Sequence, residues 1–75
     1  MTKDERLLLE LFKVAPRDVD LPFNPQPVIQ RLGYKEHLVK EIFKGLVKAN
    51  LIKIIAPDEI LLTEGGRTLA LTLTT

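Results

Sequence analysis

The chain lacks most of the residues from which catalytic and metal sites are built. Its 75 residues contain no cysteine, no serine and a single histidine, His37. The absence of cysteine excludes disulfides and thiolate-bound metals. A nucleophile paired with a general base has few candidate residues, and one histidine among scattered carboxylates lacks the spacing of a metal site. We therefore predict a protein that is not an enzyme and that has no cofactor and no metal.

Long apolar runs are also missing. The longest runs are three residues, as in Leu7–Leu9, whereas a membrane-spanning helix needs roughly 20 apolar residues. The N-terminus, MTKDERLL, lacks the apolar run and the small-residue cleavage site of a signal peptide. Because 45% of the residues are nevertheless apolar, we expect one globular domain over residues 1–75, without a membrane partner and in the cytoplasm.

Positive charge is concentrated in the middle third of the chain, although the net charge is only +1. Residues 26–53 carry six basic and two acidic side chains, a net +4, whereas residues 1–25 are net −1 and residues 54–75 are net −2. A concentrated basic segment is typical of a surface that meets a polyanion. We therefore expect any binding surface for nucleic acid to lie in this segment.

Local patterns in the first half predict helices joined by a constrained connector. Thr2 and Glu5 have the capping-box spacing, so a first helix should run from Lys3 to Val14 and end before Pro16. Four prolines in residues 16–27 restrict the connector, within which residues 19–23 alternate and could form a short extended segment against the core. Asn24 and Pro25 favour the start of a second helix over Pro25–Leu32, and Gly33 favours a left-handed end.

The second half predicts a longer helix, a hairpin and a last short helix. Helical periodicity covers Lys35–Ala49, with Asn50 as a left-handed cap. The segments 51–56 and 59–63 are rich in β-branched and apolar residues around a Pro57-Asp58 turn, which indicates two antiparallel strands. Thr63 can cap a final helix over residues 64–72, whose two glycines weaken it by propensity. The fold class is therefore α+β.

The order and the motifs of these elements resemble the winged helix-turn-helix superfamily of small bacterial regulators. In that pattern "LG" closes the second helix, an apolar triplet anchors the third, and a "GLI"-type exit and an "LT-x-x-G" follow; the resemblance covers residues 5–73. The corresponding positions here are Leu32-Gly33, Val39, Phe43 and Leu46, Asn50-Leu51-Ile52, and Leu62-Thr63-Glu64-Gly65-Gly66-Arg67. The resemblance implies a three-helix core with a short hairpin wing, and double-stranded DNA as the partner of helix 35–49.

The third helix offers a basic face opposite its predicted core. On a helical wheel, Lys40, Lys44 and Lys48 lie away from the apolar seam of Val39, Phe43 and Leu46. The resemblance makes His37 and Lys44 candidates for base edges and Lys40, Lys48 and Arg31 candidates for phosphates. The predicted nucleic-acid-binding residues are Arg31, Lys35, His37, Lys40, Lys44 and Lys48.

Two alternatives stay open at this point. Lysines opposite a core are also what any solvated helix carries, and Glu41 within the basic face and an acidic tip at Asp58 and Glu59 oppose phosphate. A winged helix that docks a protein, as part of a larger assembly and without DNA contact, is the second hypothesis. A homodimer is a further possibility, because Leu9 lies outside the narrowest core stripe of the first helix and residues 69–73 are apolar. The alternative explanation of these residues is that they complete a small core.

Overall fold

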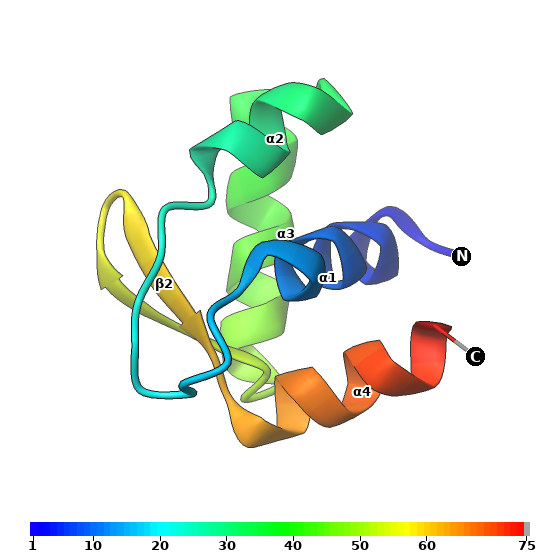
Figure 1. Ribbon diagram of the computed structural model, residues 1–75. Helices are drawn as coiled ribbons and strands as arrows, with labels where there is room; N and C mark the ends of the chain where they lie inside the picture. Colours follow the sequence, from blue (N-terminus) through cyan, green and yellow to red (C-terminus); the bar gives the residue numbers. More distant parts are fainter. Residues whose placement is uncertain (75) are drawn as a thin grey trace.

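In the computed structural model, which describes residues 1–74, four helices pack with a two-stranded antiparallel hairpin that projects from one side (Figure 1). The prediction of an α+β fold is confirmed, and every predicted helix and strand is present within about two residues of its expected ends. The elements are α1 (Lys3–Val14), α2 (Gln26–Leu32), α3 (Glu36–Lys48), β1 (Ile52–Ala56), β2 (Glu59–Leu62) and α4 (Glu64–Thr74). None of these helices is long and apolar enough to cross a membrane.

Helix α1 begins with the predicted capping box and supplies the centre of the core. The Thr2 hydroxyl accepts a hydrogen bond from the Glu5 backbone N–H, and the Thr2 N–H donates to the Glu5 carboxylate. All four of its leucines, at positions 7, 8, 9 and 11, are buried, including Leu9, which is only 7% exposed. Leu9 therefore follows the alternative in which it completes the core, although it lies outside the narrowest stripe: α2, α3 and α4 all pack on α1, so α1 is covered on more than one side.

The connector between α1 and α2 crosses the hairpin and forms backbone pairing with it at one residue. Phe23 and Ile60 exchange both backbone hydrogen bonds, at 2.8 and 2.9 Å. Val19 and Leu21 are exposed, so the predicted extended segment is reduced to this single bridge. The Arg67 guanidinium of α4 donates to the Pro16 carbonyl at 2.7 Å, which fastens the start of the connector.

Short local signals mark the ends of α2 and α3. The Gln26 N–H donates to the Asn24 side chain at 2.9 Å, and Gly33 closes α2 in the left-handed region with φ 71°. Asn50 takes the same conformation after α3, with φ 60°, and turns the chain into β1. The predicted left-handed ends at Gly33 and Asn50 are confirmed. The start of α2 differs, because Pro25, expected as its first residue, is its N-cap, and α3 also begins one residue later than expected.

The core seam of α3 differs by one position from its prediction. Val39, Ile42 and Leu46 are buried, while Phe43 is only half-buried against the core cluster. Phe43 lies at the edge of the apolar arc and lines two surface hollows, one with Ile54 of β1 and one with Gln26 and Ile29 of α2. One side of its ring is therefore left toward the surface.

Gly66 is needed where α4 passes the exit of α3. An ideal Cβ on Gly66 would lie 2.0 Å from the Leu51 carbonyl oxygen, a distance that no side chain tolerates. The Thr63 hydroxyl caps α4 by accepting from the Gly66 N–H at 3.0 Å and donates to the Asn50 carbonyl at 2.6 Å. The glycine that weakens α4 by propensity therefore permits its close packing.

Candidate binding groove between α3 and β1

The exposed face of α3 gathers four of the six predicted nucleic-acid-binding residues. His37, Lys40, Lys44 and Lys48 are spaced three or four residues apart, so the helix brings them to one side. Together with further α3 residues and one hairpin residue, Ile54, they line one open groove with a volume of about 630 Å³. The four residues therefore lie on one surface.

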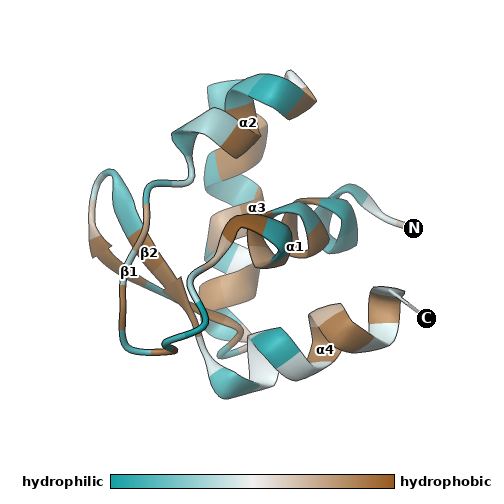
Figure 2. Ribbon diagram, viewed as in Figure 1, coloured by the Kyte–Doolittle hydropathy of each residue, from teal (hydrophilic) through white to brown (hydrophobic). Residues whose placement is uncertain are grey.

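The floor of this groove is apolar. It is formed by Phe43 and Val47 on α3 and by Ile54 on β1, and the exposed fractions of Val47 and Ile54 are 42% and 52%. Ile54 lies on the same face of β1 as the buried Ile52, but one step further along the strand. It therefore lies beside the outer half of α3 instead of in the core. Figure 2 shows the corresponding apolar colouring of the hairpin.

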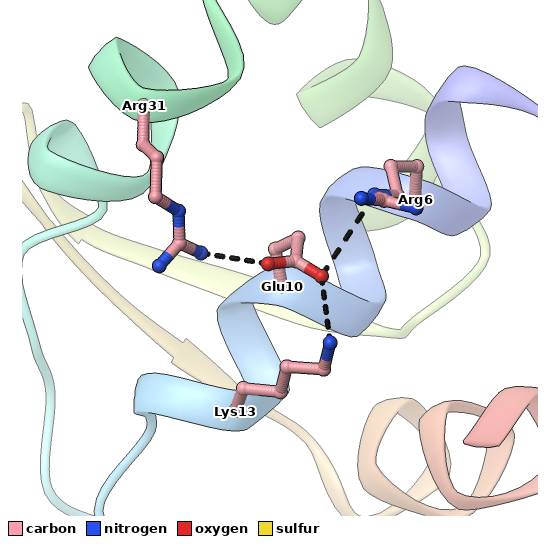
Figure 3. A network of polar contacts seen from close by, with 4 residues as sticks. All are labelled: Arg6, Glu10, Lys13 and Arg31. Carbon is pink, nitrogen blue, oxygen red and sulfur yellow. Dashed lines mark hydrogen bonds and ion pairs between the residues drawn. The ribbon is translucent and has the colours of Figure 1, made fainter.

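Arg31 lies elsewhere and has a structural partner. Its guanidinium donates to the Glu10 carboxylate at 2.7 Å, and Lys13 donates to the other oxygen at 3.0 Å, with Arg6 at 3.8 Å (Figure 3). The hydrogen bond from Lys13 is the main cause that lowers the pKa of Glu10, and the nearby charges of Lys13, Arg31 and Arg6 act in the same direction. Arg31, predicted as a phosphate contact, therefore does not line the α3 groove and is instead paired with Glu10 of α1.

The remaining basic residues of the middle segment are also dispersed. Lys35 precedes the first residue of α3 and is not part of the groove lining. Lys53 alternates with Ile52 and Ile54 along β1, so it points to the opposite face of the hairpin, where Asp20 and Glu64 line the same hollow. The net +4 of residues 26–53 therefore does not form one continuous surface.

Acidic groups reduce the positive charge of the groove itself. Glu41 lies on its lining, and the Lys40 ammonium is 3.4 Å from the Glu36 carboxylate. The hairpin tip carries Asp58 and Glu59, both exposed. The groove is therefore an apolar floor with a modest lysine rim, rather than a uniformly basic surface.

Sequence reasoning missed Val47 and Ile54 as site residues. The wheel places Val47 at the margin of the apolar arc of α3, and strand alternation alone assigns Ile54 to the core face. The available signal was the number of apolar residues: a short helix and a short hairpin cannot bury all of those present, so two of them stay exposed. Their shared surface became visible only when α3 and β1 were placed side by side.

Neither a metal-binding cluster nor a similarity to known proteins indicates what the groove binds. Among residues 1–74 there is no cluster of three His, Asp or Glu side chains that could hold a metal ion. No protein-family model matches the chain, and neither the curated proteins nor the solved structures give a significant match. The geometry of the groove therefore carries the functional argument.

Proposed function

We propose that the chain is a non-enzymatic winged-helix module that docks an acidic polypeptide segment in the groove between α3 and β1. The observation that carries this proposal is the apolar floor with Val47 and Ile54 about half exposed. Exposed apolar patches rimmed by polar residues mark interaction sites for apolar side chains, and a DNA backbone offers none. The lysine rim then selects a partner whose flanking residues are acidic.

The order of the elements supports the winged-helix part of the proposal. A helix, a short helix, a tight left-handed turn and a longer helix are followed by a hairpin, with Phe23 adding a single bridge to β2. In this arrangement α3 corresponds to the recognition helix and β1–β2 to the wing, so the groove lies between the two parts that contact partners in such folds.

Duplex DNA is the second candidate partner. The four-residue spacing of Lys40, Lys44 and Lys48 favours it, because three ammonium groups on one helix face can follow phosphates. In this candidate Lys40 and Lys48 contact phosphates while His37 and Lys44 reach base edges. Glu41 and the acidic hairpin tip oppose this function.

Two matched double variants separate the two candidates. Val47→Thr with Ile54→Thr removes apolar floor while keeping β-branched shapes, and Lys40→Ala with Lys44→Ala removes rim charge. Peptides selected from a displayed random library on the wild-type protein should carry apolar and acidic residues, and the floor variant should weaken their binding about tenfold. Anisotropy titrations with a mixed-sequence duplex are measured in parallel across a range of salt concentrations.

The docking proposal and the DNA candidate predict different results in this experiment. Selection of no peptide, or of peptides indifferent to the floor variant, would overturn the docking proposal. Salt-sensitive duplex binding that ignores the floor variant, and whose salt slope falls by about two units in the lysine variant, would establish the DNA candidate instead.

Self-association is proposed for α4 alone, since Leu9 is buried. Leu71 of α4 is 55% exposed, and residues 68–74 carry no charge that would oppose a second copy. Sedimentation velocity should show a concentration-dependent dimer that Leu71→Asp abolishes. The groove is a poor surface for pairing with itself, because two lysine rims would then repel each other.

A further inference from the structure

The hairpin has one edge without a neighbouring strand. The two-stranded sheet has the order β1–β2, and the Phe23 bridge lies on the far side of β2. Within residues 1–74, β1 is therefore the strand at the open edge of this sheet. Its edge runs beside the groove, because Ile54 of β1 lines the groove floor.

The hydrogen-bond register shows which backbone groups face this edge. Ile60 uses both its N–H and its C=O toward Phe23, so neither is directed at β1. Ile54 is the residue opposite Ile60. Opposed residues in an antiparallel pair either exchange both hydrogen bonds or exchange none. The N–H and C=O of Ile54 therefore point away from β2, toward the open edge.

The neighbouring positions follow the same alternation. Lys53 opposes Leu61 and forms the hydrogen-bonded pair, and the Thr63 N–H donates to the Leu51 carbonyl at 3.1 Å. A register shift occurs between Ile54 and Ala56, which places Ile55 in a bulge with 53% of its surface exposed. Outward-facing backbone groups and exposed isoleucines therefore coincide at one short stretch of edge.

We infer that the acidic segment docks as an extended strand that adds to the open edge of β1. Its backbone exchanges hydrogen bonds with the N–H and C=O of Ile54, and alternate side chains lie over the groove. One of these is apolar and covers Phe43, Val47 and Ile54. Acidic residues two positions away on the same face meet the rim lysines. This inference rests on the proposed docking function and specifies its mode of binding.

The test begins with the peptides selected on the wild-type protein. Strand addition predicts a consensus with one apolar residue and acidic residues two positions before or after it, so that these side chains lie on the same face of the added strand. Single N-methylation along the best peptide should reduce affinity about tenfold at every second position, because only alternate N–H groups face β1. This measurement leaves the protein unchanged, so it does not depend on the folding of a variant.

Amide exchange gives a second, residue-specific measurement. In the free protein the Ile54 amide should exchange faster than the Lys53 amide, and binding of the peptide should slow Ile54 about tenfold or more. Ile54→Pro removes the outward donor without touching the ladder bonds to β2, so it should weaken binding about tenfold, whereas Ile54→Val should retain it.

Failure of this inference and failure of the docking function give different results. A consensus with helical spacing, or an N-methyl scan without alternation, would overturn strand addition while peptide binding at the groove persists. Absence of any selected peptide, or binding of duplex DNA alone, would overturn the docking function and the inference together.

Discussion

The two sides of the molecule differ in whether their charged side chains are paired and their apolar side chains are buried. On the closed side, where α1 packs against α2 and α4, the Glu10 carboxylate receives Lys13 and Arg31 at 3.0 and 2.7 Å, and the leucines of α1 are buried. On the open side, where α3 and β1 form the groove, Lys40 is the only lysine of the α3 rim with an ion pair in the described chain. There Val47 and Ile54 are about half exposed.

This difference separates basic residues that serve the fold from those that are available to a partner. Arg31 and Lys44 are both exposed cations of the basic middle third, and sequence position does not distinguish them. Their acidic neighbours distinguish them. The Glu10 carboxylate of α1 forms an ion pair with Arg31 of α2. Lys44 instead shares an open helix face with Glu41 and several other charged side chains. Substitutions on the closed side should therefore change stability, and substitutions on the open side should change binding.

The largest expected effect on the closed side is at Gly66. Gly66→Ala should lower the free energy of unfolding by about 3 kcal/mol, because its Cβ would overlap the Leu51 carbonyl and force α4 outward. Gly65→Ala is the matched control: its nearest contact would be an ordinary 3.7 Å, and alanine favours the helix by up to about 1 kcal/mol. Denaturant unfolding of both variants measures the contrast. Equal effects at the two glycines would contradict the close approach.

Glu10→Gln should have an intermediate effect. The neutral amide keeps the shape but loses the charge that three cations share, which should cost about 1–2 kcal/mol of unfolding free energy. Glu36→Gln is the control, since its pair with Lys40 is fully at the surface and should contribute less than about 0.5 kcal/mol. A Glu10 variant as stable as the Glu36 variant would show that the Glu10 network contributes no more than a surface pair.

Stability should also depend on pH through Glu10. Its pKa in the folded protein lies below the ordinary value of 4.5, so the unfolded chain binds the proton more readily than the folded one. The stabilisation is present above pH 4.5 and is lost as the pH falls through the lowered folded value. Glu5, whose hydrogen bonds with Thr2 lower its pKa, adds to this acid sensitivity. Thermal unfolding at pH 6 and at pH 3 should differ less in Glu10→Gln than in the wild type.

The smallest effects on stability are expected on the open side. Lys44→Ala with Lys48→Ala, and Val47→Thr, should each stay within about 0.5 kcal/mol of the wild-type unfolding free energy. These side chains are exposed and make no ion pair within residues 1–74. The same variants should weaken peptide binding, so the ratio of binding loss to stability loss is the quantity that separates the two sides. A loss of stability comparable to that of Glu10→Gln would mean that the groove is part of the fold.

Most of the fold was predictable because its signals are local. The capping box at Thr2, the left-handed Gly33 and Asn50, and the Pro57-Asp58 turn each act within a few residues. The core face of α3 followed from periodicity, apart from the exchange of Phe43 for Ile42. These features depend on backbone geometry that a short stretch of sequence determines.

The composition of the groove was only partly predictable because it depends on contacts between distant segments. Helical spacing placed His37 with Lys44, but Arg31 reaches Glu10 across 21 residues of sequence. The position of Ile54 beside Phe43 and Val47 depends on how the chain turns after Asn50. No local pattern reports which apolar side chains stay uncovered after packing, so the basic face was predicted and its apolar floor was not.

The bulge after Ile54 has a consequence for the solubility of the molecule. An exposed, regular strand edge with isoleucines can template the addition of further copies, and such growth leads to fibres. Here the register shift ends the regular edge after Ile54, and Lys53 places a charge within it. The regular edge is therefore long enough to pair with one short strand. It is too short, and too twisted by the bulge, for copies of the chain to add one after another. Straightening it, by deleting Ile55, should convert a binding edge into an aggregating one.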